Sequence, residues 1–189
     1  MLIVFLVIIG FLIVGLIGYF VTIYNGLVRL RRNVKKNWSN IDVLLKQRHD
    51  ELPKLVSVCE GYMKYESETL SKITSLRTSF LNAKTVGETA RLEGQLSGAL
   101  KSLFAVVERY PDLKADQRFA QLQERISFLE NQIADRRELY NESVTIYNIR
   151  INQIPDKFIA DACNFIGSEL FKVAEEERKD VKINFNFPK

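Results

Sequence analysis

The chain has 189 residues, 47% of them hydrophobic, and a net charge of +4, which leaves room for one domain of ordinary size beside a short extra segment. The modest positive charge is concentrated next to an apolar segment, which favours a membrane surface over nucleic acid as the partner. Two cysteines, Cys59 and Cys163, exclude a disulfide framework and are typical of a reducing compartment.

The N-terminal segment is apolar throughout, because residues 1–28 contain no Asp, Glu, Lys or Arg. About 20 apolar residues cross a hydrocarbon core about 30 Å thick, so Leu2 to Tyr24 predicts a transmembrane helix with aromatic residues near one end. A buried soluble helix would need protein around its whole circumference. A cleaved signal peptide would show a basic start and a small-residue cleavage site. We therefore predict an anchor over residues 1–28.

Cationic side chains follow the span at once. Five of them occur within eight positions: Arg29, Arg31, Arg32, Lys35 and Lys36. The positive-inside bias predicts a single-pass protein of the cell (inner) membrane with its N-terminus outside and its body in the cytoplasm. Such residues attract anionic head groups by roughly 1 kcal/mol each. We predict lipid contact for them, and a role in setting topology alone is the alternative.

Beyond the span the chain is predicted to be helical. Glycine and proline are scarce, 9 and 4 in the whole chain, and both interrupt helices where they occur. The predicted fold class is all-α, in which the transmembrane helix continues into a long antiparallel bundle of about four long helices plus a short C-terminal amphipathic helix. We expect the bundle domain over residues 29–180 and a tail over 181–189, where alternating apolar residues leave a strand as the alternative.

Apolar periodicity and prolines predict the helix boundaries. The first helix leaves the membrane and breaks or kinks near residue 50, ahead of Pro53, and a second ends around residues 82–86, before Gly87. A third covers about 88–110, and the fourth, 115–154, has the strongest heptad pattern and ends at Pro155. The amphipathic segment that follows contains Phe158, Ile159, Phe165, Ile166 and Phe171.

Polar residues in this pattern indicate structure rather than chemistry. We interpret His49, the only histidine, as part of a helix-to-helix junction capped by Asp50. Two Tyr-Asn pairs, at 140–141 and 147–148, lie two turns apart and predict an interhelical hydrogen-bond ladder, with small-molecule binding as the alternative. Phosphate loops, zinc-protease motifs and nucleophile elbows are not recognisable in the sequence. We predict no enzyme activity, cofactor or metal.

Several ordered motifs lie along the chain. They include Tyr24-Asn25, Trp38-Ser39-x-Ile41-Asp42, Arg48-His49-Asp50-x-Leu52-Pro53, Leu129-Glu130-Asn131, Arg136-Arg137-x-x-Tyr140-Asn141 and Ala174-Glu175-Glu176-Glu177-Arg178. On these motifs the chain after the span resembles the bacterial LemA family. The resemblance implies a membrane-anchored helical bundle without an established activity, and magnetosome-membrane relatives imply work in membrane organisation. The last residues, 184–189, extend past the usual end of the family.

The predicted function is a non-enzymatic membrane scaffold that presents the bundle for self-assembly as a homo-oligomer. The residues predicted for the bundle or partner face are Trp38, Asp42, Arg48, Asp50, Tyr140, Asn141, Tyr147 and Asn148. The alternative is an adaptor or sensor that recruits another membrane protein, such as a quality-control protease, through the amphipathic segment. A third possibility is membrane remodelling, with that segment in the bilayer interface.

Overall fold

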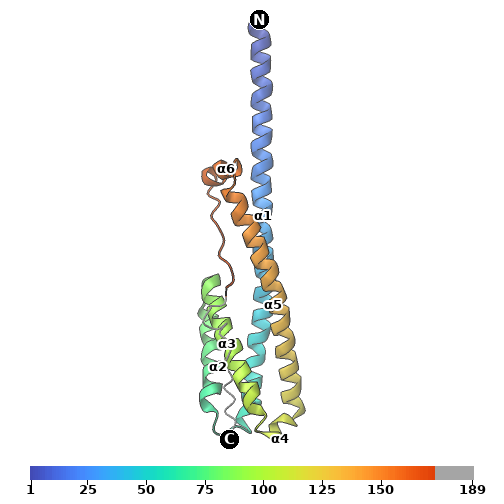
Figure 1. The fold of residues 1–189 in the computed structure, drawn as a ribbon, viewed down its shortest axis with the longest axis vertical. Helices are drawn as coiled ribbons and strands as arrows, with labels where there is room; N and C mark the ends of the chain where they lie inside the picture. Colours follow the sequence, from blue (N-terminus) through green and yellow to red (C-terminus); the bar gives the residue numbers. More distant parts are fainter. Residues whose placement is uncertain (173–189) are drawn as a thin grey trace, which may run out of the picture. The chain divides into compact units, whose positions relative to one another are not determined.

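The computed structural model describes residues 1–172, and every regular element in that range is a helix (Figure 1). The all-α class is therefore confirmed. The predicted tail at 181–189 and the family motif at 174–178 lie outside the described residues. The proposed domain division at residues 28 and 180 stays a prediction.

Helix α1, Leu2–Glu60, is continuous through Pro53, so it does not break near residue 50, and the predicted capping role of Asp50 is wrong. The alternative of a kink near residue 50 stays a prediction. A proline inside a helix leaves the carbonyl four residues earlier without its usual donor. Here that carbonyl belongs to His49, and the Arg77 side chain donates to it from Nε at 3.2 Å. The replacement donor explains how α1 continues past Pro53 to the turn at residues 61–66.

Two helices of intermediate length follow, α2 (Ser67–Asn82) and α3 (Val86–Val107), close to the predicted boundaries at 82 and 88. Thr85 caps α3, because its hydroxyl accepts a hydrogen bond from the Glu88 N–H at 3.1 Å. The Glu88 carboxylate accepts in turn from the Lys84 N–H at 3.0 Å. This reciprocal pairing satisfies free N–H groups around the start of the helix.

The remaining helices are the short α4 (Pro111–Lys114), the long α5 (Gln117–Asn152) and the short α6 (Asp156–Ala162). Helix α5 confirms the fourth predicted helix to within two residues at each end. The amphipathic segment is helical only as far as Ala162. Asn164 then takes a positive φ of 54°, a conformation that Asn tolerates better than most residues and that ends a helix.

The chain divides into two compact units. Among the described residues, unit 1 comprises Met1–Leu45 and Asn131–Leu170, and unit 2 comprises Lys46–Glu130 with Phe171 and Lys172. Helices α1 and α5 each contribute residues to both units.

Each unit buries its own apolar set. In unit 1 the buried residues of α1 include Leu27, Val34 and Ile41, and those of α5 include Ile133 and Val144. The spacing of seven in α1 is that of helices packed along a common seam. In unit 2 one cluster draws on α1, α2, α3, α4 and α5, with Leu52, Ile73, Leu96, Leu113 and Phe119 among its members.

Candidate functional site

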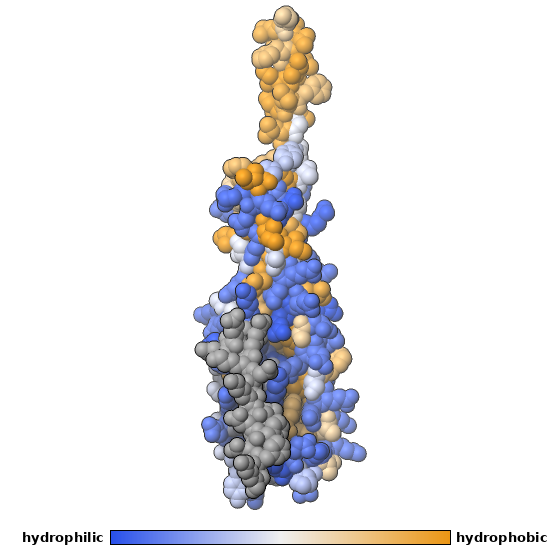
Figure 2. Space-filling view, in the orientation of Figure 1, coloured by the Kyte–Doolittle hydropathy of each residue, from blue (hydrophilic) through white to orange (hydrophobic). Residues whose placement is uncertain are grey.

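The first part of α1 has the composition of a membrane span. It is the one helix among the described residues that is long and apolar enough to cross a membrane, and its most apolar window has no buried residue. Figure 2 shows this end of α1 as a continuous hydrophobic surface. The five cations that follow it, Arg29 to Lys36, are all exposed. Their lipid contact stays a prediction.

A polar clamp on α5 holds the chain that follows α6. The Tyr147 hydroxyl donates to the Ile166 carbonyl at 3.0 Å, and the Tyr140 hydroxyl donates to the Glu169 carbonyl at 2.8 Å. The two tyrosines are seven residues apart, about 10.5 Å along the helix. Three residues of extended chain cover about the same distance. The segment 166–169 is therefore extended along α5.

Asn148 completes the clamp through both polar atoms of its amide. Its Nδ2 donates to the Ser168 carbonyl at 2.9 Å, while its Oδ1 accepts from the Ser168 N–H at 2.8 Å. The bound chain passes so close that a Cβ on Gly167 would lie 3.2 Å from that Oδ1. The ladder predicted from the Tyr-Asn pairs exists, but its partner is an extended backbone rather than a helix, so the interhelical interpretation is wrong.

The tyrosines of the clamp are shielded from water. Burial, helped by the nearby Glu169 charge, raises the pKa of Tyr140 to about 12. Burial also raises the pKa of Tyr147, against the opposing charge of Arg31. Both hydroxyls are therefore neutral donors at physiological pH, as their hydrogen bonds require. On its ring face, Tyr140 packs against Trp38 with centroids 5.5 Å apart, which places the predicted residue Trp38 in the same cluster.

A buried charge cluster lies inside unit 2. Arg48 and His49 of α1 and Glu93 of α3 are all buried. The two carboxylate oxygens of Glu93 contact one partner each. Nη2 of Arg48 donates to Oε2 of Glu93, while Nε2 of His49 lies 2.6 Å from Oε1. Arg48 also donates to the Ser97 hydroxyl at 3.3 Å. The imidazole stacks on Phe80 with centroids 3.8 Å apart.

The cluster keeps Glu93 ionised. Burial by itself raises the pKa of the Glu93 carboxyl, but the hydrogen bond with His49 and the charge of Arg48 together hold that pKa below its usual value of 4.5. An ionised carboxylate only accepts hydrogen bonds, so Nε2 of His49 carries the proton. Nε of Arg48 and Nδ1 of His49 have no partner among the described residues. The arrangement is a buried ion pair within a helical core.

The cluster revises the interpretation of three predicted residues. Arg48 lies in the core of the bundle, Asp50 is exposed, and His49 sits in mid-helix rather than at a junction. Sequence reasoning missed Glu93, although a signal was present. Glu93 shares a helical face with Leu96 and Leu100, and a carboxylate on an apolar face needs a cationic partner.

The other predicted face residues take intermediate positions. Asp42 and Asn141 are both half-buried. The amphipathic segment splits, because Ile159, Phe165 and Phe171 are buried whereas Phe158 and Ile166 are exposed. Cys59 belongs to the core of unit 2, and burial, together with the Glu60 charge, raises the pKa of its thiol to about 11. The thiol is therefore protonated at physiological pH.

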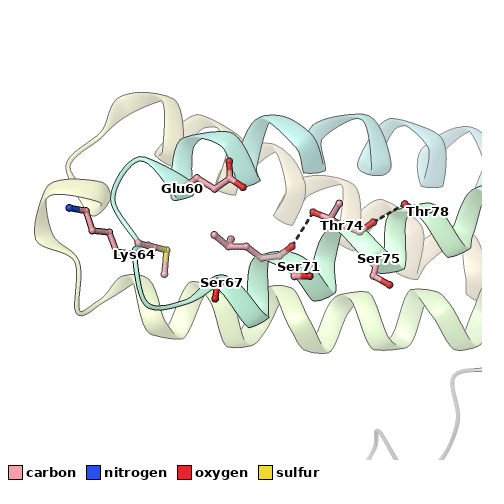
Figure 3. A pocket seen from close by; sticks show the side chains of 9 residues that line it. Glu60, Lys64, Ser67, Ser71, Thr74, Ser75 and Thr78 are labelled. Carbon is pink, nitrogen blue, oxygen red and sulfur yellow. Dashed lines mark hydrogen bonds between the residues drawn. The ribbon is translucent and has the colours of Figure 1, made fainter.

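An open groove of about 600 Å³ lies where α1 ends and α2 begins, within unit 2. Serine and threonine side chains of α2 line most of it, with Glu60 and Lys64 near the turn (Figure 3). The Thr74 and Thr78 hydroxyls donate to carbonyls four residues earlier at 3.1 Å, so they are engaged within α2. Among residues 1–172 no three His, Cys, Asp or Glu side chains gather as metal ligands.

Known proteins resemble this chain over most of its length. The family model described as the LemA family matches residues 37–185. Protein LemA of Metamycoplasma hominis is 32% identical over 171 residues, covering 87% of this chain and 78% of that protein. Magnetosome protein MamQ 2 of Paramagnetospirillum magneticum is 25% identical, covering 85% of this chain and 68% of that protein. Magnetosome protein MamQ of Magnetospirillum gryphiswaldense is 22% identical, covering 84% and 69%.

Proposed function

Because the chain belongs to the LemA family, we propose that it is a non-enzymatic, single-pass membrane scaffold that self-assembles through an exposed face of unit 1. The family match and the structure both support a helical fold and an association with the membrane. Self-assembly, the absence of catalysis and the cytoplasmic orientation of the body are parts of the proposal. The exposed cations after the span support that orientation.

One observation carries the proposal, an uncovered apolar stripe on α5. Leu139, Ile146 and Ile149 are 46%, 48% and 51% exposed. Residues seven and ten positions apart in a helix share a face, so these three form one stripe while Val144 and Ile151 are buried in unit 1. Single exposed apolar residues are ordinary, whereas a contiguous set indicates an interaction surface. We call these three residues the α5 stripe.

A second copy of the chain suits the α5 stripe. Copies anchored in one membrane share its plane, so the same stripe on each copy lies at the same height above the bilayer. A two-fold contact then needs only one self-complementary patch. The relatives named as magnetosome proteins support a role in membrane organisation, for which repeated copies are a simple means. The adaptor hypothesis assigns the same surface to a different membrane protein.

The test is the mass of the full-length protein extracted into native lipid discs. We expect a species containing several copies of this chain. Ile146→Glu places a charge in the α5 stripe and should reduce the species to a monomer. The matched control is Ala134→Glu, which adds the same charge at an exposed residue of α5 and should leave the mass unchanged. Ala134 is five and twelve positions from Leu139 and Ile146, so it lies off their face. A monomer of the natural chain would contradict self-assembly. One copy of the chain together with a recurrent membrane protein would also contradict it, and would favour the adaptor hypothesis.

A further inference from the structure

The body of unit 1 begins where the apolar span ends. Residues 1–22 of α1 include none that is buried, and the first two buried positions are Ile23 and Leu27, one turn apart. Other parts of unit 1 therefore cover α1 from Ile23 onward. Tyr24, beside that first buried residue, is the last aromatic of the span, and aromatic residues of this kind mark the interface between hydrocarbon and water.

The turn after α6 lies beside Tyr24. The Phe165 ring lies 5.7 Å from the Tyr24 ring in an edge contact, and the Arg31 guanidinium lies 4.8 Å from the Phe165 ring centre. Tyr24 and Arg31 are about 10 Å apart along α1. The turn therefore lies against α1 between an interfacial aromatic and a juxtamembrane cation, at the depth of the lipid head groups.

Helix α6 is held firmly in this place. Asp156, at its start, is buried and pairs with Arg150 of α5. Ile159 and Ala160 on one side of α6 are buried in unit 1. The clamp by Tyr147 fixes the backbone at Ile166, so α6 is tied to α5 before and after it.

The opposite side of this region is apolar and uncovered. Ile154, Phe158 and Ile166 are 76%, 68% and 80% exposed, although each is a large hydrophobic residue. Lys157, on the same short helix, is also exposed. Figure 2 shows hydrophobic surface reappearing around α6, below the span and among hydrophilic residues. Packing within unit 1 leaves these side chains without cover.

We propose that α6 and its flanking residues form a second membrane contact, in which Ile154, Phe158 and Ile166 insert into the head-group boundary of the leaflet beside the span. Segments with an apolar side and nearby cations lie in this zone, with the apolar side about 5–10 Å deep. The lipid surface is the occupant because the contact with Tyr24 sets the height of the segment. Exposed cations on the same unit, Arg29 and Arg32 among them, complement anionic head groups.

This contact has a consequence that a single span lacks. One transmembrane helix alone tilts in the bilayer, whereas a second insertion point beside it restricts the tilt. The α5 stripe would then be presented at one height above the bilayer. The membrane contact does not depend on self-assembly, because a monomer in a bilayer makes it equally well.

The test uses tryptophan as a depth probe in the full-length chain. The parent carries Trp38→Phe, which removes the only native tryptophan and keeps a ring beside Tyr140. Phe158→Trp and Ile166→Trp are made in this parent. The matched control is Val43→Trp, because Val43 is also an exposed apolar residue of unit 1 but lies about 28 Å farther along α1 than Tyr24.

Each variant is placed as single copies in discs of phosphatidylcholine and phosphatidylglycerol, with or without bromine on the acyl chains near the head group. We expect blue-shifted emission and quenching by the brominated lipid for Phe158→Trp and Ile166→Trp, and neither for Val43→Trp. Emission and quenching equal to the control would overturn the proposal. A blue shift without quenching would also overturn it, because protein rather than lipid would then cover the site.

Circular dichroism checks that each variant keeps the helicity of the natural chain. If Trp38→Phe lowers the helicity, the three substitutions are made in the natural chain and its own emission is subtracted. The same quenching difference between positions 158 and 43 is then expected. An equal signal at both positions would again reject the second contact. The oligomer measurement on Ile146→Glu is independent, so either proposal can fail without the other.

Discussion

The clamp of unit 1 and the charge cluster of unit 2 stabilise their polar side chains in opposite ways. In unit 1 the clamp residues Tyr140, Tyr147 and Asn148 are neutral and bind the backbone of one extended segment. In unit 2 Arg48 and Glu93 are charged and bind each other inside the core. The loss of one neutral hydrogen bond lowers the free energy of unfolding only a little. A buried charge that loses its partner lowers it several times more.

The clamp and the charge cluster differ because the clamp binds an extended segment, whereas the charge cluster joins two helices. The segment 166–169 lacks a helical ladder of its own, so side chains of α5 supply the partners for its backbone groups. Unit 2 is made of helices whose backbones are already paired, and its charges join α1 to α3. We therefore expect the clamp to respond weakly to pH and to release the segment 166–169 locally when it is weakened, while changes to the charge cluster affect unit 2 as a whole.

The largest effect is expected from Glu93→Ala, which leaves the Arg48 charge buried without its partner. We expect the free energy of unfolding to fall by about 3–5 kcal/mol, measured by urea unfolding of the detergent-solubilised chain. Glu108→Ala, at the residue that follows the same helix, is the control. Its carboxylate is exposed and pairs with Lys114 at 2.6 Å, and such surface pairs contribute about 1 kcal/mol or less. Equal losses in the two variants would contradict the contrast.

A second prediction concerns the carbonyl that Pro53 leaves without a helical donor. Arg77→Leu removes the side chain that donates to the His49 carbonyl, and an unsatisfied carbonyl costs about 1–3 kcal/mol. Pro53→Ala restores the N–H that pairs with this carbonyl in a regular helix. Arg77→Leu should therefore cost less in a Pro53→Ala background. Identical losses in both backgrounds would show that Arg77 does not serve as the replacement donor.

The clamp in unit 1 should give a smaller and more local effect. Asn148→Ala removes the two hydrogen bonds to Ser168, a loss of about 1–2 kcal/mol at about 1 kcal/mol per bond. Amide hydrogen exchange at Ser168 and its neighbours should accelerate, while the amides of α3 should keep their protection. Asn152→Ala is the control, since this exposed amide donates only to the Asn148 carbonyl within α5. Loss of protection in α3 would mean that the clamp is not a local device.

The stability of unit 2 should depend on pH through the Glu93 carboxyl. The pKa of Glu93 is lower in the folded chain than its usual value of 4.5, so the unfolded chain binds the proton more readily. The resulting stabilisation is present above pH 4.5 and is lost as the pH falls through the folded pKa. Glu93→Gln should show a smaller loss of stability on acidification, measured by urea unfolding across pH 3–7. Equal acid sensitivity in the two chains would contradict this.

The sequence predicted much of the helical framework because the framework depends on local pattern. The heptads of residues 126–151 and the proline at 155 set the extent of α5, and the gap between residues 82 and 88 sets the start of α3. The continuity of α1 through Pro53 could not be predicted, for a physical reason. The donor that compensates for it, Arg77, is far away in sequence, and single-sequence periodicity does not show long-range partners.

The polar sites were predicted only in part for the same reason. The Tyr-Asn repeat in α5 identified the clamp residues, since the repeat is local, but not the extended segment that they hold. Glu93 was in phase with Leu96 and Leu100, yet only the fold brings it to Arg48 and His49. The amphipathic segment was recognised by composition, but which of its apolar residues remain exposed depends on packing against α1 and α5.

The most direct test of the proposed scaffold is photo-cross-linking in living cells from position 146. A photoreactive amino acid replaces Ile146 in the full-length chain, with Ala134, an exposed residue of α5 off the stripe, replaced in the same way as the control. We predict that irradiation yields a product of two copies of this chain from position 146 and much less from position 134. A product with a different protein, or equal yields from both positions, would contradict self-assembly through the α5 stripe.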